Sequence, residues 1–179
     1  MEETVRLHGI ADASLRRIAE KAGLSLQMVS HYFGNREELV LAFVRRIAEQ
    51  ILAAVEAEVA GKIPARQLDA LIDFLFGVQY KELTGNDVIG REVWALAERD
   101  EKVRAILSGA YNNAIGRLGE VLTGAYPNAD PKDCRTIAYM LTCLQEAHEF
   151  FSGIGVDKPK SEDICNAARR LTASLDSNL

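Results

Sequence analysis

Apolar residues that recur every four positions most strongly limit how this chain can fold. An α-helix has 3.6 residues per turn, so such a spacing places side chains along one face of a single helix. No segment alternates apolar and polar residues with the period of two that a half-buried strand requires. The sequence therefore predicts an all-α protein. The longest run with this spacing is Leu39, Phe43, Ile47, Ile51, Val55 and Val59.

Two short helices separated by a tight turn are predicted within the first forty residues. Ser14 is placed to cap the first helix, and Gly23 is placed to end it because glycine tolerates a positive φ. Ser25 is placed to cap the second helix. We expect the inner face of the second helix to consist of Val29, Tyr32 and Phe33.

Capping residues, prolines and glycines predict the boundaries of the later helices. Asn35, followed three residues later by Glu38, predicts the start of the long helix. A proline in the first turn after an aspartate is a further start signal. The later boundaries are expected, in chain order, at Gly61, Pro64, residues 83–87, residues 88 and 99, Asp100, Asp130 with Pro131, and Ser161.

Composition and charge exclude several classes of protein. The chain has 179 residues, of which 48% are hydrophobic and 26% charged, as in ordinary globular proteins. Its net charge is −5, and residues 1–50 hold seven basic and seven acidic residues, so nucleic acid would need a local basic patch. No run reaches about 18 apolar residues, so we expect no membrane span.

The cysteines and the N-terminus indicate a cytoplasmic protein. The three cysteines contain no CxxC pair, which favours reduced thiols over a zinc site or a disulfide framework. The first residues, MEETVRLHG, lack the apolar region of a signal peptide. We expect a cytoplasmic location and no cofactor. The cysteines are Cys134, Cys143 and Cys165.

The two short helices and the glycine turn between them have the spacing of a helix-turn-helix motif. A helix of the second helix's length fits the major groove of DNA, with its first residues at the base edges. The spacing alone fits a plain helical hairpin within a bundle equally well.

The residues IAEKAGLS, followed by VSHYFGNREELV, resemble the DNA-binding segment of the tetracycline-repressor (TetR) family of bacterial regulators. The resemblance covers about forty residues. It implies a helix-turn-helix DNA-binding domain over residues 1–45. A long helix would join this domain to a ligand-binding and dimerisation domain over residues 46–179. The matching residues are Ile18-Ala19, Ala22-Gly23-Leu24-Ser25, Val29, Tyr32-Phe33 and Arg36-Glu37-Glu38-Leu39.

The resemblance implies which residues contact DNA. Leu26, Gln27 and Met28 take the positions that approach the bases. An amide such as Gln27 can pair with adenine in two hydrogen bonds, and Met28 can lie against a thymine methyl group. Positions that contact phosphates, or flank those contacts, are Ser14, Ser25, Ser30, His31, Tyr32 and Arg36.

The chain departs from the family pattern in two respects. The family usually has tyrosine at the position of Ser30 and threonine or serine at that of Met28, so contacts there should be weaker or differently selective. The family's first helix runs for more than ten residues before the glycine that matches Gly9, whereas here only EETVRLH precedes it. We expect a late start of the sequence; the alternative is a protein that binds DNA poorly.

Aromatic and polar residues of the C-terminal region are candidates for an effector pocket. Such pockets combine apolar walls with a few placed polar groups. The same aromatic residues would also serve simply to fill a core, and His148 would also fit a dimer seam. The candidates are Phe74, Tyr80, Trp94, Tyr111, Glu146, His148 and Phe150, with Phe76, Gln79 and Asn112 as further lining residues.

No pattern in the sequence indicates catalysis or a metal site. We find no nucleophile with its base, no phosphate-binding glycine loop and no metal ligands at the usual spacing. His8 and His31 are better explained as solvated or phosphate-facing side chains than as a metal site. We therefore expect that the protein is not an enzyme.

The last two helices are predicted to form a homodimer interface. Their small and apolar residues can pair with those of a second copy in a four-helix bundle. The alternative is that this face closes the core of the single subunit. The residues are Ala138, Met140, Leu141, Leu144, Ala167, Ala168, Leu171 and Leu175.

Two functional hypotheses follow. The first is a homodimeric repressor that binds a palindromic operator in double-stranded DNA and is released by a small-molecule effector. The second is a helical small-molecule sensor or carrier with impaired DNA binding. A helical enzyme ranks third.

Overall fold

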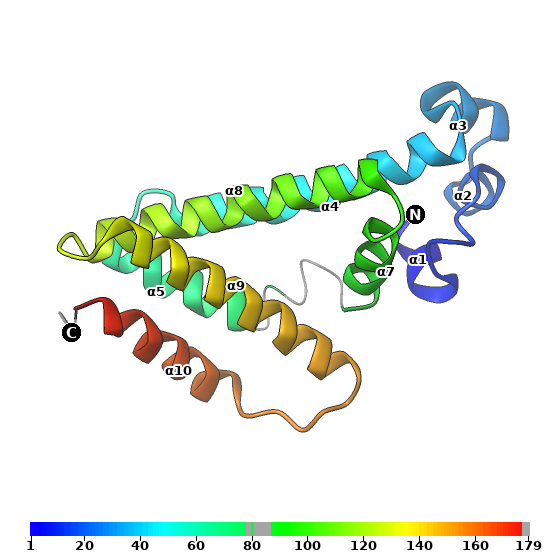
Figure 1. Cartoon of the computed structure of the whole chain (residues 1–179). Coiled ribbons are helices and arrows are strands. Elements are labelled where there is room, and N and C mark those ends of the chain that lie inside the picture. Colours follow the sequence, from blue (N-terminus) through cyan, green and yellow to red (C-terminus); the bar gives the residue numbers. More distant parts are fainter. Residues whose placement is uncertain (78–79, 81–86, 177–179) are drawn as a thin grey trace. The chain divides into compact units, whose positions relative to one another are not determined.

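The computed structural model describes residues 1–77, 80 and 87–176, and this part of the chain is helical without a strand (Figure 1). The predicted all-α fold is confirmed. Val78, Gln79 and most of the helix end predicted at residues 83–87 lie outside the described residues. The elements are α1 (Glu2–His8), α2 (Leu15–Ala22), α3 (Leu26–Phe33), α4 (Arg36–Val59), α5 (Pro64–Phe76), α7 (Asp87–Ala97), α8 (Glu101–Ala125), α9 (Pro131–Gly153), α10 (Ser161–Ala173) and the 3-10 helix η1 (Ser174–Asp176).

The predicted caps of the first helices are confirmed. The Ser14 hydroxyl oxygen accepts a hydrogen bond from the backbone N–H of Arg17 at 3.2 Å, which starts α2. Ser25 accepts from the N–H of Met28 at 3.1 Å and starts α3. These side chains satisfy amides that have no partner within the helix itself.

The starts of the later helices are predicted correctly with one exception. Asp100 and Asp130 cap α8 and α9 through their carboxylates, and Asn35 caps α4. Ser161 does not cap α10: it is the first helical residue, and Lys160 occupies the cap position without a side-chain hydrogen bond. Lys160 has the extended backbone of a cap residue, so Ser161 lies one position too late to act as the cap.

The chain forms two compact units, each with its own core. Unit 1 comprises residues 1–50 and 88–109, and unit 2 comprises residues 51–87 and 110–179. Helices α4 and α8 contribute residues to both. The predicted functional division between residues 45 and 46 stays a prediction, because compactness does not itself define a functional domain. Among the described residues, no helix is long and apolar enough to cross a membrane.

The core of unit 1 joins α1, α4, α7 and the start of α8. Short as it is, α1 places Val5 in this core with no exposed surface. Tyr32 was expected to face inward but is 76% exposed, so that expectation is wrong. In the eight-residue helix α3, Val29 is the buried residue, which leaves Tyr32 outside the narrow buried stripe. The core residues are Val5, Ile10, Val40, Leu41, Phe43, Val44, Ile89, Val93, Ala97 and Val103.

The core of unit 2 brings together α5, α8, α9, α10 and the end of α4. Helices α8 and α9 pack against each other at Gly119, where an added Cβ would make an ordinary van der Waals contact of 3.7 Å with the Cα of Arg135. Helix α10 lies beside α5 (Figure 1), where Arg169 forms ion pairs with Asp69 and Asp73. Cys134 and Cys165 are buried as thiols. The large buried residues include Val59, Leu71, Ile72, Leu118, Leu122 and Leu141.

Two glycines of unit 1 should respond oppositely to substitution by alanine. Gly23 has φ 67°, so Gly23→Ala should cost about 1 kcal/mol of stability, since a Cβ disfavours this conformation. Gly90 lies in α7 with nothing within 4 Å of the added Cβ. Gly90→Ala should stabilise by about 0.5–1 kcal/mol through helix propensity. Urea unfolding of both variants measures the difference; equal effects would contradict this account of Gly23.

Candidate functional site

The first turn of α3 displays the three residues predicted to read bases. Leu26 is 47% exposed and Met28 46% exposed, and Gln27 between them is exposed as well. The next residue, Val29, is only 2% exposed and anchors the helix. The side chains before Val29 are therefore available to a partner, whereas α3 itself is held from behind.

The turn between α2 and α3 fixes the geometry of the pair. Gly23 adopts the left-handed conformation at φ 67° and ψ 26°, and the N–H of Leu24 donates to the Ala19 carbonyl at 2.9 Å. Ala19 is 2% exposed, and its small side chain leaves room for α3 to pack against α2. The capping oxygens of Ser14 and Ser25 accept backbone N–H groups, and each hydroxyl still carries a proton that it can donate to a phosphate.

The other predicted phosphate contacts occupy different environments. His31 and Tyr32 are exposed and meet edge to face, with ring centroids 5.8 Å apart. Ser14 is exposed and Ser30 is half-buried. All four lie in or beside the helix-turn-helix, and their contact with phosphate stays a prediction.

Sequence reasoning missed the basic residues of α2 as candidate phosphate contacts. The basic residues of this helix form exposed ion pairs, which are weak in water and can exchange for a phosphate. The sequence feature that could have identified them was the position of these basic residues in the helix that precedes the turn. The pairs are Arg16–Glu20 at 3.1 Å, Arg17–Asp12 at 3.0 Å and Lys21–Glu3 at 2.6 Å.

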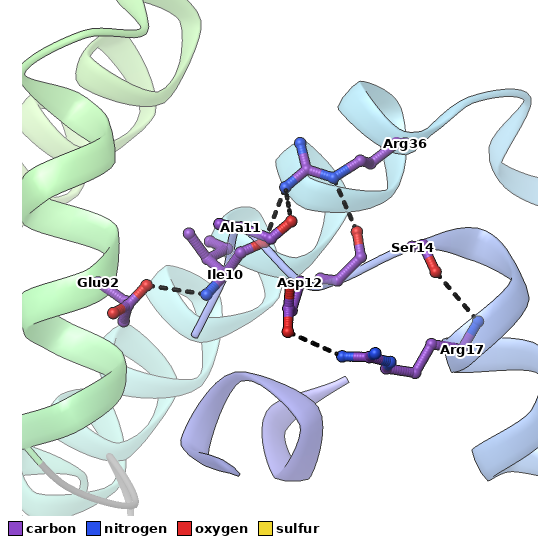
Figure 2. Close-up of polar contacts among 8 residues, drawn as sticks. Ile10, Ala11, Asp12, Ser14, Arg17, Arg36 and Glu92 are labelled. Atoms are coloured by element: carbon purple, nitrogen blue, oxygen red, sulfur yellow. Dashed lines mark hydrogen bonds and ion pairs between the residues drawn. The ribbon is translucent and has the colours of Figure 1, made fainter. Parts of the chain in front are cut away.

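Arg36 occupies a place that the sequence did not predict. Its guanidinium donates hydrogen bonds to three backbone carbonyls of the segment between α1 and α2 (Figure 2). The Nε–oxygen distance is 2.8 Å to Ala13, and the Nη2–oxygen distances are 2.7 Å to Ile10 and 3.1 Å to Ala11. Arg36 therefore joins the start of α4 to the entry of α2, and its predicted contact with phosphate stays a prediction.

Glu92 of α7 holds the other side of the same segment. Its Oε2 accepts a hydrogen bond from the N–H of Ile10 at 2.8 Å (Figure 2). A Cβ on Gly9 would lie 3.2 Å from that oxygen, and Gly9 has φ 75°, so a side chain there would be both crowded and strained. The segment before α2 is thus held by the Arg36 guanidinium at three of its carbonyls and by the Glu92 carboxylate at the amide of Ile10.

Several predicted effector-site residues come together within unit 2. The Tyr111 hydroxyl of α8 donates to Glu146 Oε1 of α9 at 2.9 Å. Tyr80 is 7% exposed and meets Phe74 edge to face, with ring centroids 5.5 Å apart.

The remaining predicted residues are less closely associated. Trp94 lies in unit 1 and is 42% exposed. Phe150 is 41% exposed and its ring packs on that of Phe151. His148 is half-buried, Asn112 is exposed and Phe76 is buried in the core. Gln79 lies outside the described residues.

The acidic group of this cluster has an unusual electrostatic environment. Burial raises the pKa of Glu146 from 4.5 to about 7, against the opposing effect of the hydrogen bond from Tyr111, while the charge of Glu149 raises it further. Burial, together with the charges of Glu146 and Glu149, also raises the pKa of Tyr80. Tyr80 therefore stays neutral near pH 7, and the Glu146 carboxyl exchanges its proton there.

Two further residues of α9 belong to the cluster and were not predicted. Gln145 is only 2% exposed. Among the residues that the structure describes, neither its Nε2 nor the buried Oε2 of Glu149 has a partner at hydrogen-bond distance and angle, although the Gln145 amide lowers the pKa of Tyr80. The signal for Gln145 was its position: it continues the buried stripe of Cys134, Ala138 and Leu141, where an apolar residue would be expected. Within the described part of the chain, no group of three or more potential metal ligands is present.

Replacement of Glu146 should change how stability depends on pH. In the folded protein the carboxyl keeps its proton up to about pH 7, whereas the unfolded chain loses it near pH 4.5. The free energy of unfolding should therefore fall between these values, by about 2–3 kcal/mol from this group. Glu146→Gln keeps an acceptor for Tyr111 and should remove this loss. Urea unfolding of both proteins across this pH range measures the difference, and parallel curves would contradict it.

Replacement of Arg36 by lysine should destabilise the DNA-free protein. A single ammonium group cannot reproduce the planar fork that reaches three carbonyls. We expect a loss of about 1–2 kcal/mol for Arg36→Lys. The control is Arg46→Lys, which replaces an exposed arginine of the same helix. Equal stability of the two variants by urea unfolding would show that the three contacts contribute little.

Comparison with known proteins agrees with this geometry. Residues 2–43 match the sequence model described as "Bacterial regulatory proteins, tetR family". The HTH-type transcriptional regulator BetI of Stenotrophomonas maltophilia (strain R551-3) is 42% identical over 74 residues, which are 40% of this chain and only 37% of BetI. The nicotine-responsive repressor HdnoR of Paenarthrobacter nicotinovorans is 23% identical over 163 residues, which are 90% of this chain and 84% of HdnoR.

Solved structures share the fold over nearly the whole chain. A TetR transcription regulator from Haloarcula marismortui ATCC 43049 has a TM-score of 0.82 at 20% identity, covering 97% of this chain and 93% of its own. A putative transcriptional regulator from Saccharomonospora viridis in complex with choline has a TM-score of 0.74 at 16% identity. The match covers 98% of this chain and 91% of that protein. With the geometry described above, the sequence matches show that residues 2–43 are a helix-turn-helix domain of the TetR family of bacterial regulatory proteins, and the solved structures show that nearly the whole chain shares the fold of such regulators.

Proposed function

We propose that the protein is a cytoplasmic homodimeric repressor that leaves a palindromic DNA operator when a small molecule binds it. The observation that carries this proposal is the exposed first turn of α3, with Leu26, Gln27 and Met28 outward and Val29 buried behind them. Such a turn suits the major groove, where the first residues of a recognition helix meet the base edges. The proposal assigns the chain no catalytic step and no cofactor.

The surroundings of α3 supply groups suited to the DNA backbone. The Ser14 and Ser25 hydroxyls lie at helix N-termini, where partial positive charge favours an anion. Helix α3 contains no acidic residue, so nothing in it repels phosphate. These features compensate locally for the absence of an overall basic charge.

The buried Val5 favours the repressor over the alternative of a sensor with impaired DNA binding. That alternative arose because only seven residues precede Gly9 in helical form. Val5 and Thr4 of α1 are nevertheless fully buried, so this helix contributes to the core of unit 1, the unit that also contains α2 and α3. The functional division into a DNA-binding domain and an effector domain is part of the same proposal.

The proposed effector site is the cluster around Glu146 in unit 2. A small-molecule response is supported by HdnoR, which is named as nicotine-responsive, and by the choline bound to the Saccharomonospora viridis protein. In this chain, Tyr111 and Glu146 link α8 to α9 through a partly buried polar contact. Apolar walls with a few placed polar groups are typical of ligand sites.

The proposed dimer interface lies on α9 and α10 and keeps Met140 and Leu144 from the residues expected there. Ala138 and Leu141 have no exposed surface, so they close the core of their own subunit and cannot meet a second copy. Residues on the opposite side of α9 are exposed because the helical period separates the two faces. These large exposed residues are Tyr139, Met140, Leu144 and Phe151.

Release from DNA requires the effector to favour one conformation over another. A tenfold loss of operator affinity corresponds to about 1.4 kcal/mol of coupling free energy. Helix α4 runs without interruption from Arg36, which holds the segment before α2, to Val59 in the core of unit 2. We propose that this helix transmits the change.

Gln27→Ala tests the assignment of the base-reading residues. It should weaken binding to the operator by about 5–100-fold, because a bidentate contact to adenine contributes about 1–3 kcal/mol. Binding to unrelated DNA, and the dependence on salt, should stay the same, since phosphate contacts are untouched. The measurement is fluorescence anisotropy with DNA from upstream of the gene.

The matched control is Asn113→Ala, an exposed amide in unit 2. It should leave affinity for DNA unchanged. Wild-type affinity that does not vary with salt concentration would contradict phosphate contacts and the repressor function with them.

A further inference from the structure

We propose that the effector is an organic cation with a hydrogen-bond acceptor, held by Glu146, Glu149 and Gln145 of α9 beside Tyr80 and Tyr111. This inference rests on the proposed function, in which a small molecule binds unit 2. It adds the chemical class of that molecule and the group that recognises each of its parts.

Unpartnered polar atoms are the first support. Gln145 is only 2% exposed, and within the described part of the chain its Nε2 has no partner at hydrogen-bond distance and angle, although the amide acts on the Tyr80 hydroxyl, whose pKa it lowers. The buried Oε2 of Glu149 likewise accepts from nothing there. Buried polar groups are normally paired, since leaving one unpaired costs free energy. A ligand that offers an acceptor to Gln145 and positive charge to Glu149 satisfies both atoms.

The arrangement on α9 brings these groups onto one side of the helix. Gln145 and Glu149 are four residues apart and Glu146 and Glu149 are three apart, so Glu149 neighbours each of the other two on the helix surface. Gln145 also continues the stripe that faces the core. Its side chain is therefore directed into unit 2 and not towards solvent.

Uncompensated negative charge is the second support. Neither Glu146 nor Glu149 forms an ion pair with a basic residue among those the structure describes. Two neighbouring carboxylates with restricted access to water repel each other. A cation placed between them would favour the charged form of both, which a neutral or anionic molecule cannot do.

The aromatic residues explain why the cation should be organic. Tyr80 is only 7% exposed, and the centroid of its ring lies 5.5 Å from that of the Phe74 ring. Tyr111 donates to Glu146 Oε1 at 2.9 Å and so orients that carboxylate. The faces of aromatic rings attract alkylated ammonium groups, and their apolar surface accommodates the alkyl substituents.

The first experiment compares a cation with its neutral counterpart on the full-length protein. The probes are choline, a quaternary ammonium with a hydroxyl group, and 3,3-dimethyl-1-butanol, which has the same shape with carbon in place of nitrogen. Isothermal titration calorimetry should show at least tenfold tighter binding of choline at about pH 8, which is above the pKa of about 7 of Glu146. Equal binding of the two probes, or no binding of choline, would overturn the inference.

Variants identify the groups that recognise each part of the ligand. Glu146→Gln and Glu149→Gln should each weaken binding of choline at least tenfold, whereas Glu162→Gln, an exposed acid of α10, should not. Gln145→Leu should weaken binding of choline but not of tetramethylammonium, which lacks the hydroxyl group. If Glu146→Gln and Glu149→Gln both bind choline as tightly as the wild type, the cation binds elsewhere and the assignment is overturned.

Operator binding is measured separately, so the two proposals can fail independently. Selective binding of choline without any binding to DNA would leave the cation site standing and contradict the repressor. Salt-dependent binding to DNA without selectivity for the cation would leave the repressor standing and contradict the cation site.

Discussion

The hydrogen bonds of Arg36 to the carbonyls of residues 10, 11 and 13 are the contact on which the arrangement of unit 1 depends. The segment between α1 and α2 is not helical, so its carbonyls have no partners within a helix. One guanidinium at the start of α4 satisfies three of them, while Glu92 of α7 binds the amide of Ile10. Helices α1, α2, α4 and α7 are thereby tied at one short segment, and α3 is positioned by its packing on α2.

A second constraint governs unit 2, and it is electrostatic. Gln145 and Glu146 lie on a helix whose other inward residues are small or apolar. An apolar pair at these positions would pack more favourably, because buried polar groups lose their hydration. The unpartnered atoms and the pKa of Glu146 near 7 mark a part of the core that is not optimised for the isolated subunit. Such local cost is typical of sites that bind a ligand.

Much of the fold and part of the candidate site were predictable from local sequence. Ser14, Ser25, Asn35, Asp100 and Asp130 cap helices as expected, because capping depends on residues only two or three positions away. Exposure of Leu26 and Met28 followed from the anchoring of Val29 one turn into α3. Tyr32 was placed wrongly because an eight-residue helix has too few turns to define the width of its buried face.

The sequence by itself determined the helices, their caps, the helix-turn-helix and the family, since each depends on neighbours within a few residues or on a contiguous motif. Only the tertiary structure decided that Arg36 binds carbonyls 23 to 26 residues away and that Glu92 meets Ile10 across 82 positions. It also decided that Tyr111 meets Glu146, 35 residues apart, and that Gln145 Nε2 and Glu149 Oε2 have no partner at hydrogen-bond distance and angle in the described chain. Contacts between distant residues depend on how helices pack, and no local pattern specifies that packing.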